Sequence, residues 1–308
     1  MSSLQTIKKK NKLLEFIFYG NFFYGICAAA LSVEASLQQS FPLNGSLYFV
    51  LVFFITVLYY AYPYIRKTLI RSKNPRTNWY SQHYNLMRWN QILITAILLF
   101  SVFLFFKQHE KALLRMSIDQ WLLILTFPTT GALYYGTNFL LGKYSLRKIG
   151  WLKPFIIGFT WAGLVTVYPV LFYDIINQQE YQLNWTGGLL FLKNFMFVSV
   201  LCIMFDIKDY AVDYIARLKT FVVKLGLRKT IFYILLPLSL TGLVSFIFYA
   251  ETHQFHQMRI LLNIIPFILL ALVVWSLRKR RSLLYYLCIV DGLMLIKAIC
   301  GSIAITCF

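Results

Sequence analysis

Acidic residues are scarce in this chain: eleven Asp and Glu stand against thirty Lys and Arg in 308 residues, a formal net charge of +19. Charged residues make up only 13% of the sequence, whereas 59% of the residues are hydrophobic. A nucleic-acid-binding protein of this charge would carry more polar surface, and a soluble domain could not cover so much apolar side chain. The apolar content also excludes a disordered chain. The composition therefore predicts an integral membrane protein, with no nucleic acid as a partner.

Cysteine is also sparse. The five cysteines are an odd number, and no two of them form a Cys-x-x-Cys pair. This spacing indicates neither a disulfide framework nor a zinc site. We expect these side chains to act as small apolar filler within the spans.

Long apolar runs separated by short polar breaks fill the rest of the chain. A helix needs roughly 20 such residues to cross a bilayer. The sequence therefore predicts an all-α multispan protein with about nine transmembrane helices. The predicted spans are Leu13–Val33, Leu47–Ile65, Trp89–Phe106, Trp121–Leu141, Pro154–Tyr173, Gly187–Phe205, Thr230–Ala250, Ile260–Leu277 and Leu283–Phe308.

The basic residues alternate with these spans. Twenty-four of the thirty lie on one predicted side, four lie on the other, and Lys193 and Lys297 fall within spans. The positive-inside rule then places the N-terminus in the cytoplasm. We expect a single transmembrane domain over residues 1–308, located in a bacterial inner (plasma) membrane. Membrane lipids are expected partners, because a basic surface attracts anionic headgroups.

Three of the eleven acidic residues fall within one eight-residue window, as Asp206, Asp209 and Asp213. On a helix their spacing places them at about 0°, 300° and 340°, so they share one face. The window lies where the sixth predicted span leaves the membrane on the cytoplasmic side. Three carboxylates on one face repel one another, and Mg²⁺ is the natural cation to hold them. The alternative is a solvated loop in which they pair with Lys208, Arg217 and Lys219.

The Asp-x-x-Asp-x-x-x-Asp pattern, followed by Lys219, Thr220 and an apolar stretch that ends at Leu225 and Gly226, resembles the second aspartate motif of the UbiA superfamily of intramembrane prenyltransferases. The segment from Leu133 through Tyr134 to Lys148 is similar to the tyrosine and basic cluster that follow the fourth helix of that family. The predicted helix number and the cytoplasmic side of the motif resemble the family as well.

The resemblance implies a UbiA-like helical bundle that transfers a prenyl group from a polyprenyl diphosphate to a lipophilic acceptor, with Mg²⁺ as cofactor. Asp206, Asp209 and Asp213 would be the catalytic and metal-binding residues. The diphosphate would be contacted by basic residues, because metal ions and cations stabilise the negative charge that the leaving group gains. These contacts are Lys219, Arg66, Lys67, Lys143 and Arg147.

The first aspartate motif of the family has no counterpart here. The corresponding segment, Tyr59–Lys67, is rich in tyrosine, and no acidic residue lies between Glu34 and Glu110. Three interpretations stay open. One metal cluster and direct basic contacts could bind the diphosphate, or the chain could be a divergent member with changed chemistry or substrate. The third is a non-catalytic protein of the same fold that binds a lipid diphosphate or a protein partner.

Three ionisable residues, Lys193, Asp291 and Lys297, lie inside predicted spans. Ionisable groups at such depth usually face a cavity or another polar group. The two lysines could instead extend outward along their helices to the membrane surface. Asp291 and Lys297 do not share a helix face, so we expect no pair between them.

Overall fold

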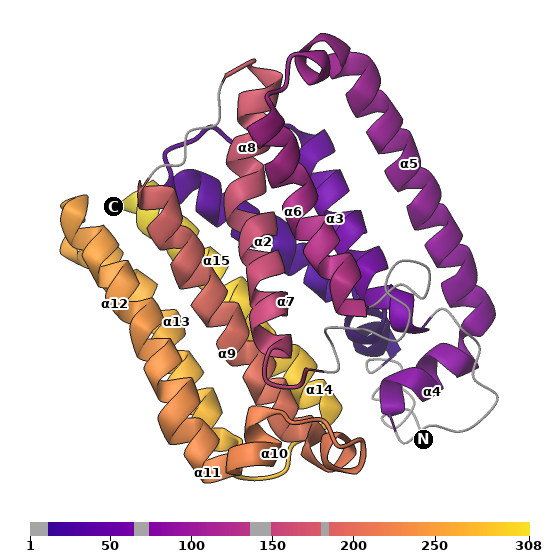
Figure 1. The fold of residues 1–308 in the computed structure, drawn as a ribbon, viewed down its shortest axis with the longest axis vertical. Coiled ribbons are helices and arrows are strands. Elements are labelled where there is room, and N and C mark those ends of the chain that lie inside the picture. The colour runs from indigo at the N-terminus through magenta and orange to yellow at the C-terminus, as the bar shows by residue number, and fades with distance from the viewer. Residues whose placement is uncertain (1–11, 65–73, 136–148, 180–184) are drawn as a thin grey trace, which may run out of the picture. The chain divides into compact units, whose positions relative to one another are not determined.

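The computed structural model describes residues 12–64, 74–135, 149–179 and 185–308, and every regular element in these ranges is a helix (Figure 1). The first helices are α2 (Phe22–Gln38), α3 (Ser46–Ala61), α4 (Pro75–Gln82), α5 (Tyr84–Leu114) and α6 (Ile118–Tyr135). They are followed by α7 (Lys153–Ala162), α8 (Tyr168–Ile176), α9 (Trp185–Ile215), α10 (Phe221–Leu225) and α11 (Leu227–Thr230). The last are α12 (Leu236–Thr252), α13 (Gln257–Ser276), α14 (Leu283–Tyr285) and α15 (Gly292–Cys307).

The predicted all-helical class with several candidate membrane spans is confirmed. Within the described ranges, seven helical segments are long and apolar enough to cross a membrane. An eighth is possible if the bent pair Lys12–Tyr19 and Phe22–Gln38 forms one span. The seven are Ser46–Tyr64, Tyr84–Leu114, Lys153–Ile176, Trp185–Ile215, Leu227–Thr252, Gln257–Ser276 and Leu283–Cys307.

The remaining predicted span, Trp121–Leu141, is not among these segments. Its described part is α6, an 18-residue helix with Asp119 in its first turn and Pro128 in its interior. Residues 136–141 lie outside the described part of the chain. The number nine and the UbiA-like bundle therefore stay predictions.

The chain divides into two compact units, Met1–Ala29 with Asn44–Leu113, and Ala30–Leu43 with Leu114–Phe308. A single domain over residues 1–308 stays a prediction. The candidate site and the charged clusters described below lie entirely in the second unit.

In the first unit, the chain bends by 61° between Tyr19 and Phe22. Asn21 takes a φ of 71° there, a left-handed conformation that asparagine tolerates better than most residues. The Asn21 amide donates to the Tyr80 hydroxyl at 2.9 Å, and Arg76 donates to the Asn21 side-chain oxygen and to the carbonyl of Tyr19. Burial raises the pKa of Tyr80 to about 12, so this hydroxyl stays protonated. The bend is thus held by buried hydrogen bonds.

In the second unit, α9 packs against α7 and α12. Gly158 of α7 permits a close approach, because a Cβ at this position would stand 2.2 Å from Ser199 Oγ on α9. The Asn194 amide of α9 donates to Thr166 Oγ1 at 2.8 Å, in the short π-helical segment that joins α7 to α8. Large apolar side chains such as Leu240 on α12 and Leu272 on α13 are exposed, as expected for surfaces that face lipid.

Candidate functional site

The three aspartates of the sequence motif lie near the C-terminal end of α9, which continues without interruption from Trp185 to Ile215. Asp206 is fully buried, Asp213 is 6% exposed and Asp209 is half-buried. The carboxylate of Asp206 interacts electrostatically with those of Asp213 and Asp209. The helix therefore brings the three acidic groups within electrostatic range of one another.

Asp206 forms an ion pair with Lys153, the first residue of α7. Lys153 Nζ donates to Asp206 Oδ1 at 2.7 Å. The second oxygen, Asp206 Oδ2, is buried and has no hydrogen-bond partner among the described residues. Lys153 also interacts electrostatically with Tyr134 and Asp213. One acceptor position at this buried carboxylate is therefore unused.

The described arrangement does not fit a three-carboxylate metal centre. Asp209 Oδ1 accepts from the neighbouring Lys208 at 2.6 Å, and Asp206 Oδ1 accepts from Lys153. Within the described ranges, no three His, Cys, Asp or Glu side chains are close enough to hold a metal ion together. The unused Asp206 Oδ2 could supply one ligand at most. Mg²⁺ at these aspartates therefore stays a prediction.

Of the residues predicted to contact a diphosphate, only Lys219 lies in the described part of the chain. It is exposed between the end of α9 and the start of α10. Arg66, Lys67, Lys143 and Arg147 lie outside the described residues. Their predicted roles are untested.

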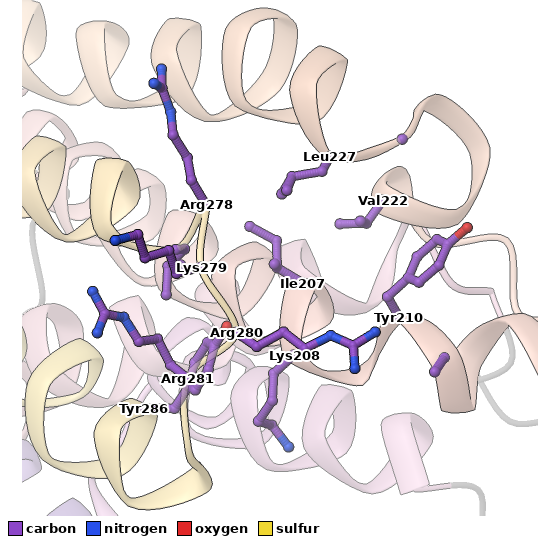
Figure 2. Close-up of a pocket in the computed structure, with 13 residues that line it drawn as sticks. Ile207, Lys208, Tyr210, Val222, Leu227, Arg278, Lys279, Arg280, Arg281 and Tyr286 are labelled. Atoms are coloured by element: carbon purple, nitrogen blue, oxygen red, sulfur yellow. The ribbon is translucent and has the colours of Figure 1, made fainter.

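A pocket of about 650 Å³ lies between the end of α9, the α10–α11 segment and the loop that joins α13 to α14 (Figure 2). Its lining combines apolar side chains with a run of cations and two tyrosines. The apolar wall comprises Ile207, Ala211, Val222, Leu227 and Leu277. The basic and aromatic wall comprises Lys208, Arg278, Lys279, Arg280, Arg281, Tyr210 and Tyr286, and Gly226 completes the lining.

The basic side chains of the pocket differ in how firmly they are held. The Arg278 guanidinium stacks on Trp275 at 3.4 Å from the ring centroid, and that of Arg281 lies 5.0 Å from the Tyr285 ring. In Figure 2, Arg280 extends toward Tyr210, on the side of the pocket opposite to Lys279. Lys279 and Arg280 are exposed, and neither forms an ion pair with another described residue. These two cations are the ones most available to an anionic ligand.

The pocket and the aspartates occupy different faces of α9. The α9 residues that line the pocket are Ile207, Lys208, Tyr210 and Ala211, which alternate with the aspartates along the helix. Asp209 is nevertheless close enough to Tyr286 of the pocket wall to interact electrostatically with its hydroxyl. In the sequence, the run Arg278–Arg281 indicated only membrane orientation. Its four consecutive cations were the sequence signal that could have pointed to this basic pocket lining.

The two lysines inside the spans do not extend to the membrane surface. Lys193 and Lys297 are each 2% exposed, and both approach Glu34, which is fully buried in α2. Glu34 was missed because the first predicted span ended one residue earlier, at Val33, whereas α2 continues to Gln38.

These features define a helical protein with several membrane-spanning segments, a basic pocket at one end of α9 and a charged cluster buried nearer its other end. Comparison with known protein families, curated proteins and solved structures finds no match.

Proposed function

We propose that this protein binds a polyprenyl diphosphate in the basic pocket at the end of α9 and transfers its prenyl group to a lipophilic acceptor. The charge bias of the loops supports a cytoplasmic location for this end and for the N-terminus, in a bacterial inner membrane. The single observation that carries the binding proposal is the mixed lining of the pocket, in which apolar side chains and a run of cations surround one space.

An isoprenoid diphosphate has matching chemistry. Its headgroup carries several negative charges, which an exposed cation of the lining, Arg280 or Lys279, can neutralise through charge-assisted hydrogen bonds. Its first isoprene units are apolar and fit beside Val222 and Leu227. The rest of the chain can continue into the surrounding lipid, because the neighbouring helices expose apolar side chains.

The transfer step is supported by the resemblance of residues 206–226 to the second aspartate motif. In this step the carbon–oxygen bond of the allylic diphosphate breaks, and the diphosphate leaves with the electron pair. The acceptor donates an electron pair to the allylic carbon and loses a proton. The cations of the pocket would stabilise the charge on the departing diphosphate.

A non-catalytic protein that binds a lipid diphosphate is the second candidate. The missing first aspartate motif favours it, as does the engagement of Asp206 by Lys153 and of Asp209 by Lys208. In this case the pocket would hold the same ligand without breaking its carbon–oxygen bond.

Binding can be tested with purified protein in nanodiscs and three probes: farnesyl diphosphate, farnesyl monophosphate and farnesol. We expect affinity to decrease in that order, and inorganic pyrophosphate to compete with the diphosphate. The double variant Lys279→Ala/Arg280→Ala should bind farnesyl diphosphate about tenfold or more weakly, since hydrogen bonds to charged groups contribute about 1.5–3 kcal/mol each. The matched control is Lys107→Ala/Lys111→Ala, which removes two exposed cations from α5. Equal affinity for diphosphate and alcohol would contradict the proposal.

Transfer can be tested separately with radiolabelled farnesyl diphosphate, membranes that contain the protein, and a set of quinone and haem precursors. A labelled prenylated product that requires Mg²⁺ and is lost in Asp206→Asn and Asp213→Asn would support the enzyme. Intact diphosphate binding without any product would support the non-catalytic binder.

A further inference from the structure

A second charged cluster lies inside the helices of the second unit, away from the pocket. Glu34 of α2, Lys193 of α9 and Lys297 of α15 converge there, and none of the three is more than 2% exposed. Lys297 Nζ donates to Glu34 Oε2 at 2.6 Å, and Lys193 Nζ lies 3.7 Å from Glu34 Oε1. Residues far apart in the sequence thus meet at one buried carboxylate.

Neutral oxygen atoms complete the cluster. Lys193 Nζ lies 3.2 Å from Asn263 Oδ1 and 3.4 Å from Gln38 Oε1. The Gln38 amide donates to Glu34 Oε1 at 2.8 Å and to Asn263 Oδ1 at 3.2 Å. Tyr249 of α12 donates to the Gln38 carbonyl oxygen. Five helices are therefore linked by one hydrogen-bonded network.

The charges of the cluster do not balance. With every group ionised, one carboxylate faces two ammonium groups, and a net positive charge would be left inside a membrane-spanning bundle. Such a charge is strongly disfavoured in a low-dielectric interior unless it is compensated. The lysine side chains are only 3% exposed, which leaves no accessible surface for a counter-anion. A proton, unlike a larger ion, is small enough to be gained or lost at a site that is closed to solvent.

The distances distinguish the two lysines. Lys297 makes the short contact with Glu34, as expected of a charge-assisted hydrogen bond. The closest partners of Lys193 are the amide oxygens of Asn263 and Gln38, which can accept from an amine as well as from an ammonium group. Lys193 Nζ also lies 4.6 Å from the centroid of the Phe246 ring, whose face stabilises the protonated form. Both protonation states of Lys193 thus have suitable partners.

We propose that Lys193 is a proton-binding site within the membrane, which alternates between amine and ammonium forms beside the permanent Glu34–Lys297 ion pair. The other ionisable groups near the cluster come from α12, α13 and α15. They are Tyr249, with His253 stacked on its ring, Arg259, which donates to the carbonyls of Ala304 and Ile305, and Cys300. Arg259 is engaged by these carbonyls and does not pair with Glu34.

The direct test is nitrogen-15 NMR of protein labelled at lysine Nζ, because amine and ammonium nitrogens have distinct chemical shifts. We expect one lysine signal to change between the ammonium and amine positions while the protein stays folded, and this signal to be missing from the Lys193→Met variant. A Lys193 signal that stays ammonium up to pH 10 would overturn the proposal. The wild-type titration remains decisive even if the variant folds poorly.

Thermal unfolding against pH gives a second readout. A lysine whose proton affinity differs between the folded and unfolded protein makes stability depend on pH. We expect the Tm of the wild type to depend on pH more strongly than that of Lys193→Met. Lys297→Met should remove this dependence as well, since Lys193 then becomes the sole cation beside Glu34. An unchanged slope in both variants would contradict the proposal.

Discussion

Two buried carboxylates lie along α9, Glu34 of the neighbouring α2 and Asp206 of α9 itself, and their oxygen atoms are hydrogen-bonded differently. Near the N-terminal end of α9, both oxygen atoms of Glu34 are engaged: Oε2 accepts from Lys297, and Oε1 accepts from Gln38 and lies close to Lys193. Near the C-terminal end of α9, Asp206 Oδ1 accepts from Lys153, whereas Oδ2 has no hydrogen-bond partner among the described residues. We call these the inner cluster (Glu34, Lys193, Lys297) and the outer cluster (Asp206, Lys153).

The comparison separates a carboxylate with both oxygens engaged from one that keeps an unused acceptor. The inner cluster is enclosed and has no unused acceptor on its carboxylate. The outer cluster leaves an acceptor position open, and Asp206 directly precedes Ile207 and Lys208, which line the pocket. An unsatisfied buried polar atom is unusual in a folded protein and needs an explanation, such as a bound water molecule or ion. Asp206 Oδ2 is therefore an acceptor that a ligand near the pocket could use.

The largest expected effect comes from breaking the inner cluster at its carboxylate. Glu34→Gln leaves the Lys297 ammonium buried without a counter-charge, and we expect the free energy of unfolding to fall by about 3–5 kcal/mol. Thermal unfolding in detergent measures the change, with the exposed Glu251→Gln as control. A Tm equal to that of the control would show that the inner cluster does not stabilise the bundle.

A smaller loss of stability is expected at the outer cluster. Asp206→Asn removes the ion pair with Lys153, whose side chain is 18% exposed and can recover part of its hydration. We expect a decrease of about 1.5–3 kcal/mol, typical of a hydrogen bond to a charged group. The same unfolding assay serves here. A loss as large as that of Glu34→Gln would remove the distinction between the two clusters.

The outer ion pair also depends on the close packing of α7 against α9. In Gly158→Ala the new Cβ would stand 2.2 Å from Ser199 Oγ and 2.9 Å from the Phe195 carbonyl oxygen, so the helices must separate. We expect a destabilisation of about 1–3 kcal/mol, as for other overpacked sites. Gly188→Ala is the matched control, because nothing lies within 4 Å of a Cβ there. Equal Tm values for the two variants would contradict this packing.

The smallest effect on stability is expected in the pocket itself. Lys279→Ala/Arg280→Ala should change the free energy of unfolding by less than about 0.5 kcal/mol, because both side chains are exposed. Binding of farnesyl diphosphate should weaken as salt rises, since exposed charges are screened, whereas the Tm difference caused by Glu34→Gln should not depend on salt. Titrations at several ionic strengths check both statements. Salt-independent binding would place the ligand away from the exposed cations.

Much of the helical architecture could be predicted, because a hydrophobic run long enough to cross a membrane indicates a helix. The end of α2 could not be predicted, because a charged residue such as Glu34 normally marks the end of an apolar run unless its buried partners are known. Those partners, Lys193 and Lys297, are 159 and 263 residues away, and sequence spacing does not reveal such long-range pairs. The bend at Asn21 was hidden for a related reason, because the apolar run continues on both sides of it.

At the candidate site, local spacing placed Asp206, Asp209 and Asp213 on one continuous helix. It did not reveal that Lys153, on another helix, engages Asp206. Nor could it show that the loop Arg278–Arg281 joins the wall of a pocket beside the same helix. These relationships depend on how helices pack, which periodicity within one segment does not determine.

The central claim is that the exposed cations at the end of α9 recognise a diphosphate headgroup. The most direct measurement is the ratio of affinities for farnesyl diphosphate and farnesol, determined for the wild type and for Lys279→Ala/Arg280→Ala in the same nanodiscs. We predict a strong preference for the diphosphate in the wild type, which falls about tenfold or more in the variant while farnesol affinity is unchanged. The same ratio in both proteins would contradict the claim.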